Sequence, residues 1–161
     1  MIETTRAVRG RVEELLDEYR QALLASLDGL DEDEARARLV PSRTTLLGLV
    51  KHVTYVERTW FDQAVTGRTP RGIGIASSPD RSFSLHEDDT IASVRDAYRA
   101  TADASRAALA QLAFDDVVTG RGERTVWALQ LQVLRELAHH CGHADILREQ
   151  VLARRTGDGT A

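Results

Sequence analysis

The most informative stretch of the chain reads Arg135-Glu136-Leu-Ala-His139-His140-Cys-Gly-His143-Ala-Asp145. It holds three of the chain's five histidines. On a helix with about 100° per residue, His140 lies about 40° from Glu136, with His143 near 340° and His139 near 300°. A carboxylate and several imidazoles therefore share one helix face, which is how a helical protein presents metal ligands.

The apolar residues of this helix indicate which of these side chains face the interior. On the same helical wheel a buried stripe is centred near about 60°, with Glu136 and His140 within it or at its border. We therefore expect Glu136 to need a cation, which a metal ion would supply, because carboxylates are rarely buried alone. We expect His139 to face solvent and Cys141 to be a small buried residue that points away from the cluster. The stripe consists of Val126, Leu129, Val133, Leu137, Leu147 and Val151.

Helical spacing of apolar residues predicts an all-α four-helix bundle. Ser42 is the expected N-cap of the second helix and Gly67 its stop signal. The connections after the first two helices are long enough to cross the bundle, so its order need not be up-down-up-down. A short helical turn is expected within 28–41, and no segment shows a convincing strand pattern. The predicted helices span about 9–27, 43–66, 89–113 and 124–154.

Length and composition predict one domain over residues 1–155, followed by a frayed tail over 156–161. The net charge is −4, and the absence of a basic run argues against nucleic-acid binding. No apolar stretch approaches about 18 residues, so we expect no membrane span. The single cysteine allows no internal disulfide, and the first residues lack a signal-peptide core. We therefore expect a cytoplasmic protein, with a homodimer left open.

His52 is the candidate that would complete a site. It lies at the border of the apolar stripe of the second helix, as Glu136 does on the last. If the two borders meet, His52, Glu136 and His140 provide three ligands and one open position, the pattern of a catalytic divalent metal. The metal expected first is zinc, with nickel or iron as alternatives. His143 is expected beside the site, as a hydrogen-bonding group or as an alternative ligand.

Structural readings of the same residues remain open. His52 fits a packed histidine at the edge of the core, and Glu136 with His140 fits an ordinary helix pair. His86 lies next to the irregular segment 67–85 and is read as a surface residue. That segment is rich in glycine, proline and serine, and a loop of this length is often functional.

Two stretches resemble the DinB-like superfamily, in particular an actinobacterial branch without an assigned function. They are Thr44-Thr-Leu-Leu-Gly-Leu-Val-Lys-His52, continued to Phe61, and His140-Cys-Gly-His-Ala-Asp-Ile-Leu-Arg-Glu149. The resemblance covers nearly the whole chain. It implies a four-helix bundle similar to mycothiol-dependent maleylpyruvate isomerase and bacillithiol transferases. It also implies a divalent metal held by a histidine of helix two and a pair spaced i, i+4 on the last helix.

Transferred to this chain, these ligand positions correspond to His52, Glu136 and His140. Two residues depart from the pattern. Gln132 stands where many relatives have a histidine, which bears on metal affinity or on a contact next to the metal. Arg43 replaces a frequent proline near the start of helix two, a change without expected consequence.

The function implied is a metal-dependent S-transferase that joins a low-molecular-weight thiol of the mycothiol type to an electrophilic small molecule. The segment 67–85 would cover the groove and shape the electrophile's pocket. Two alternatives stay open. One is a non-enzymatic metal-binding or stress-associated bundle, and the other is a helical dimerisation module without metal, against which the converging Glu136, His140 and His143 argue.

Overall fold

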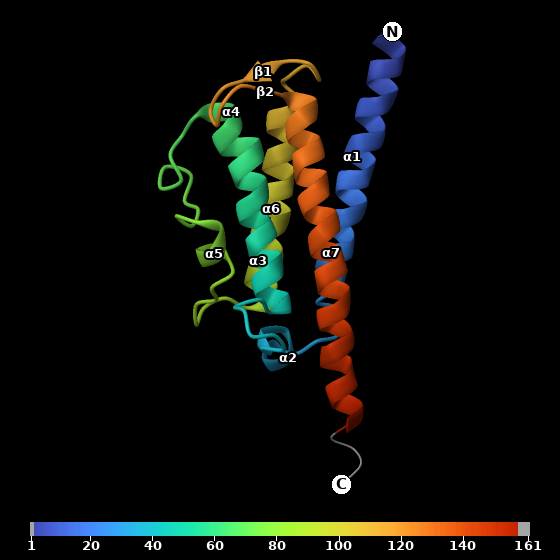
Figure 1. The fold of residues 1–161 in the computed structure, drawn as a ribbon, viewed down its shortest axis with the longest axis vertical. Coiled ribbons are helices and arrows are strands. Elements are labelled where there is room, and N and C mark those ends of the chain that lie inside the picture. The colour runs from blue at the N-terminus through green and yellow to red at the C-terminus, as the bar shows by residue number, and fades with distance from the viewer. Residues whose placement is uncertain (1, 158–161) are drawn as a thin grey trace.

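Four long helices run side by side in the computed structural model, which describes residues 2–157 (Figure 1). They confirm the predicted all-α bundle. The short elements are α2 (Glu32–Arg36), α5 (Pro79–Ser82) and the strands β1 (Val117–Val118) and β2 (Arg124–Thr125). The long helices are α1 (Ile2–Ala25), α3 (Leu46–Glu57) continued by the π-helical η1 (Arg58–Gln63) and α4 (Ala64–Thr66), α6 (Ile91–Leu109) and α7 (Val126–Gly157).

The order of the bundle is down-up-up-down, because the connection after α1 stays at one end of the bundle, whereas the connection after α4 runs back along its length (Figure 1). Helix α1 packs against α7, and α3 packs against both α6 and α7. The start of α6 lies beside the end of α1, where the Arg95 guanidinium donates to the carbonyl of Leu24 at 2.8 Å. The backbone N–H of Ile91 also donates to the Glu32 carboxylate at 2.9 Å, which fixes α2 against α6. Helices α3 and α7 are therefore antiparallel neighbours, the arrangement that a site shared between them requires.

The helix ends differ in part from the sequence predictions. The N-cap of α3 is Thr45, whose side chain accepts from the Gly48 N–H, so the expected cap at Ser42 is wrong. Both residues are good caps, and sequence alone could not separate them. Gly67 ends the second helix with φ of 71°, as predicted. Of the tail expected over 156–161, residues 156 and 157 continue α7, and 158–161 lie outside the described residues.

The remaining differences concern short elements. The first helix begins at Ile2 instead of near residue 9. A helical turn does form within 28–41, as α2, with Asp31 and Glu34 making a capping box. The strands β1 and β2 pair antiparallel in a hairpin just before α7. Each strand has only two residues, too few for an alternating pattern to be recognised.

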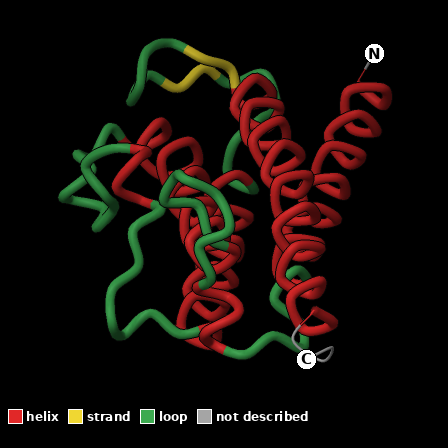
Figure 2. The backbone as a smooth tube through the Cα atoms, turned by 60° about the horizontal axis from the view of Figure 1, so that its bottom comes forward, coloured by secondary structure: helices red, strands yellow, loops and turns green. Residues whose placement is uncertain are grey.

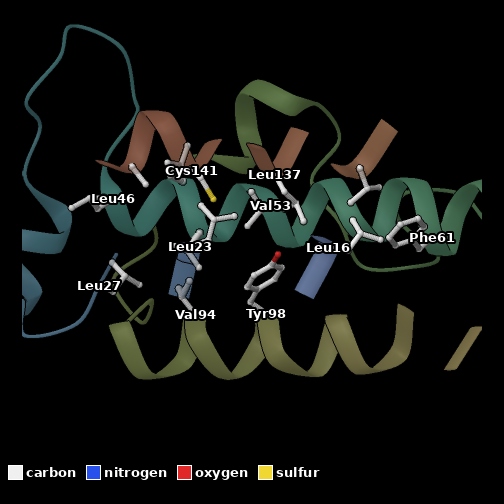
Figure 3. Packing of buried hydrophobic residues seen from close by; sticks show 14 of the residues in the cluster. Leu16, Leu23, Leu27, Leu46, Val53, Phe61, Val94, Tyr98, Leu137 and Cys141 are labelled. Carbon is white, nitrogen blue, oxygen red and sulfur yellow. The ribbon is translucent and has the colours of Figure 1, made fainter. Parts of the chain in front are cut away.

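The core lies between the four helices and consists mainly of leucine and valine (Figure 3). It also contains a buried ion pair between α1 and α3. The Arg20 guanidinium donates to both carboxylate oxygens of Glu57, at 2.9 and 2.8 Å, and the Tyr98 hydroxyl donates to the same carboxylate at 3.0 Å. The side chains labelled in Figure 3 are Leu16, Leu23, Leu27, Leu46, Val53, Phe61, Val94, Tyr98, Leu137 and Cys141.

The long connection over 67–90 lies outside the bundle and packs along α3 (Figures 1 and 2). Its close approach depends on Gly48. A Cβ atom at that position would lie 2.7 Å from the carbonyl oxygen of Phe83, nearer than such atoms normally approach. The glycine of the α3 motif therefore lets the connection dock against the helix one turn before His52. No helix among residues 2–157 is long and apolar enough to cross a membrane.

Candidate functional site

His52 of α3 and His140 of α7 meet between the two antiparallel helices. Their ring centroids are 4.7 Å apart and their planes form an angle of 82°, so one ring presents its edge to the other. Both residues are buried, with exposed fractions of 6% and 9%. The structure thus brings together the two histidines that the sequence placed at the borders of their helices.

The orientation of His52 is fixed by Ser82, at the end of α5. The His52 Nδ1 atom lies 2.6 Å from the Ser82 hydroxyl oxygen, and that hydroxyl lies 2.5 Å from the carbonyl oxygen of Pro79. A carbonyl only accepts, so the single Ser82 proton is directed to Pro79 and Nδ1–H of His52 donates to Ser82. This arrangement assigns the lone pair of the neutral imidazole to Nε2, the atom that remains free to bind a ligand.

His140 lacks the hydrogen bonds that a buried imidazole normally has. Both of its ring nitrogens are buried, and neither has a partner among the described residues. A buried polar atom left without a partner costs about 1–3 kcal/mol, so such atoms point to a missing ligand. The nearest charged atom is the second carboxylate oxygen of Glu136, 3.9 Å from His140 Nε2.

Glu136 is less buried than its wheel position suggested, and its side chain is 27% exposed. Its first carboxylate oxygen accepts from the Gln132 amide at 2.8 Å and from the Arg135 guanidinium at 3.3 Å. Arg135 therefore already supplies the cation that Glu136 was expected to need from a metal. The second oxygen faces His140, while Gln132, one turn earlier in α7, donates to the first oxygen.

The electrostatic surroundings keep both histidines neutral. Burial, with a contribution from His140, lowers the pKa of His52 from 6.5 to about 3. Burial also lowers the pKa of His140, although Glu136 acts in the opposite direction. At neutral pH each ring therefore carries a lone pair, which is the form that binds a metal ion.

The other residues singled out in the sequence surround this pair. His143 is exposed, with its ring 5.7 Å from that of His140, and His139 and His86 are also exposed. Cys141 faces α1, where its thiol donates to the Tyr19 carbonyl at 3.5 Å, and burial raises its pKa to about 11. Cys141 is therefore no candidate for a nucleophile at neutral pH.

Sequence reasoning missed two residues of the site, Ser82 and Phe83. The Phe83 ring stacks on His52 with a centroid distance of 3.9 Å and an interplanar angle of 12°. It also lies 6.3 Å from the ring of His140, so it covers the histidine pair from the side of the long connection. The one signal available was that Phe83 is the only aromatic residue in the irregular segment 67–85.

The three predicted ligands are brought together pairwise. His52 contacts His140, and His140 faces Glu136, but within residues 2–157 no group of three His, Cys, Asp or Glu side chains is arranged to hold a metal ion. Glu136 is turned toward Gln132 and Arg135, which explains why the set is not closed. Two imidazoles and a carboxylate are nevertheless donors that suit zinc or a similar divalent ion, and the unpartnered nitrogens of His140 fit such an ion.

A family model described as mycothiol-S-transferase matches residues 11–153 of the chain. The matched region begins in α1, ends in α7 and includes His52, Ser82, Glu136 and His140. A comparison with curated proteins finds no match.

Proposed function

Because the chain belongs to the mycothiol S-transferase family, we propose that it joins a low-molecular-weight thiol of the mycothiol type to an electrophilic small molecule, with the help of a divalent metal. In this proposal residues 1–155 form a single functional domain. It also places the protein in the cytoplasm, where such thiols are kept reduced.

The observation that carries the metal proposal is the unpartnered state of His140 beside His52. In the proposed site His52 binds through Nε2, His140 through a ring nitrogen and Glu136 through the oxygen that faces His140. Zinc is the metal expected first, with nickel or iron as alternatives. When bound, a divalent ion would lower the pKa of a thiol in its open position, so that thiolate forms near neutral pH.

The chain's own residues prepare the site for this chemistry. Ser82 holds the Nδ1–H of His52, so this ring does not have to be ordered when a ligand arrives. Phe83 stacks on His52 and keeps water away from the histidine pair. His143, exposed beside His140, is placed to hydrogen-bond a bound molecule.

The transfer itself balances without a protein nucleophile. The thiol loses its proton to solvent, and its sulfur forms a bond to an electrophilic carbon. The bond between that carbon and the leaving group breaks, and the leaving group departs with the electron pair. The sum is thiol plus electrophile giving thioether plus protonated leaving group, so no oxidant or reductant is needed.

A second candidate is a metal-binding bundle without catalytic activity. The low exposure of His52 and His140 favours it, since a substrate reaches these rings only if Phe83 or its neighbours move. The two functions share the metal site and differ in turnover. Their separation therefore requires a measurement of catalysis.

The experiment that tests the transferase function follows the loss of free mycothiol in the presence of zinc and a panel of haloalkyl electrophiles, each of which carries a halide leaving group. We expect consumption above the uncatalysed rate by the protein and none above it by the His140→Ala variant. His139→Ala is the matched control, because this neighbour is exposed and should retain activity. Zinc binding without any consumption would support the non-catalytic bundle instead.

A further inference from the structure

A cavity of about 330 Å³ lies beside Phe83, and three arginines line it. Arg36 ends α2, Arg38 and Arg43 belong to the segment that leads into α3, and Ser84 completes the wall next to Phe83. Residues that precede α3 and residues that follow it therefore line the same cavity. No aspartate or glutamate lines this cavity.

The positive charges of these arginines are only weakly compensated. Arg36 donates to the backbone carbonyls of His86 and Asp89, and Arg38 to the carbonyl of Ser42, and neither has an ion pair with a described carboxylate. Arg43 pairs with Asp80 at 3.3 Å, but both side chains are exposed. Exposed ion pairs of this kind contribute little to stability, so Arg43 can readily exchange Asp80 for another anion.

We propose that this cavity binds the anionic group of the electrophilic substrate, a carboxylate or a phosphate on a small molecule. Guanidinium groups match both anions through paired hydrogen bonds, and three of them gathered in a chain of net charge −4 form a local positive site. This inference rests on the proposed transferase function, because the bound molecule is a substrate only if the protein performs that transfer. It adds the chemical class of the second reactant.

Phe83 connects the cavity to the histidine pair. Phe83 lines the cavity, and its ring stacks on His52 at a centroid distance of 3.9 Å. A molecule anchored by its anionic end among the arginines would therefore extend along Phe83 toward His52 and His140. The cavity would select electrophiles by charge, and the histidine site would perform the transfer.

The test measures anion binding directly by titration calorimetry at low ionic strength, without thiol or metal. The probes are succinate and inorganic phosphate, with succinamide as the uncharged analogue of succinate. Two variants of the full chain are compared with wild type. The first combines Arg38→Ala with Arg43→Ala, and the second, Arg71→Ala, is the control. Arg71 is an exposed arginine of the connection that does not line the cavity. Arg36 is not substituted, because its guanidinium donates hydrogen bonds to two backbone carbonyls and its loss could disturb the fold.

We expect one or both anions to bind and succinamide not to bind. The double variant should weaken binding at least about tenfold, equivalent to about 1.4 kcal/mol, with Arg71→Ala close to wild type. Binding of succinate alone would assign a carboxylate ligand, and binding of phosphate alone a phosphate ligand. The proposal is overturned if neither anion binds or if the double variant binds as well as wild type. Failure of the transferase function would appear separately, as absence of thiol consumption by a protein that still binds the anion.

Discussion

The ring of His52 meets the ring of His140 edge-on, with their centroids 4.7 Å apart between α3 and α7. Both rings are neutral and buried, but their hydrogen bonding differs. His52 is held by Ser82, whereas neither nitrogen of His140 has a partner among residues 2–157. One oriented and one unsatisfied imidazole form an incomplete polar site.

Ser82→Ala should weaken zinc binding by about 10–100-fold, because the hydrogen bond that fixes His52 in its Nε2 lone-pair form is lost. The measurement is a competition titration with a chromophoric chelator. Ser77→Ala is the matched control, since this serine is exposed in the same connection and does not contact His52. Equal zinc affinities for wild type and Ser82→Ala would show that the contact is only structural.

The metal-free protein should lose stability as the pH falls below about 6.5. His52 titrates at 6.5 when exposed and at about 3 in the fold, so between these values only the unfolded chain binds the proton. The free energy of unfolding then falls with falling pH, by at most about 1.4 kcal/mol per pH unit from this group. Urea denaturation over this pH range, with a chelator present, measures the slope.

The control for this pH dependence is His52→Asn. Its side-chain amide can still donate to Ser82 but does not titrate, so the curve should become flatter over the same range. A slope equal to that of wild type would mean that His52 is not the group responsible.

Arg20→Met should reduce the free energy of unfolding by about 3–5 kcal/mol, because it leaves the buried carboxylate of Glu57 without its charged partner. Chemical denaturation followed by circular dichroism measures the change. Arg11→Ala removes two ion pairs between exposed side chains, with Glu14 and Glu18, and should leave the denaturation midpoint unchanged. A wild-type midpoint for Arg20→Met would contradict the role given to this pair.

Cys141 should be inert toward iodoacetamide in the folded protein at neutral pH and react rapidly in urea. Burial raises the pKa of its thiol to about 11, so little thiolate is present near pH 7. Mass spectrometry of labelled protein follows the reaction. Cys141→Ala should retain thiol transfer, and a folded variant without transfer would make the cysteine part of the mechanism.

Helical periodicity accounts for what the sequence predicted well. It placed His140 inside and His139 and His143 outside, and the burial of these residues in α7 agrees. The same periodicity placed His52 where it could meet His140. These predictions succeed because side-chain direction on a helix follows from residue spacing alone.

The residues that the sequence did not reveal depend on irregular backbone or on short side-chain contacts. Ser82 and Phe83 reach His52 through a connection without periodicity, whose docking depends on Gly48. The contact from Arg135 to Glu136 joins neighbours in sequence, and the wheel places them about 100° apart. A flexible guanidinium can span that angle, which a pattern of residue types does not show.

The most direct test of the proposed metal site is the number of zinc ions bound per chain, measured by elemental analysis after zinc loading and removal of excess. Wild type should bind one ion, His140→Ala none, and His139→Ala one. His143→Ala should keep the site with about 10–100-fold lower affinity, as expected for a group beside the metal. The account is contradicted if wild type binds no zinc, or if His139→Ala loses the ion while His140→Ala retains it.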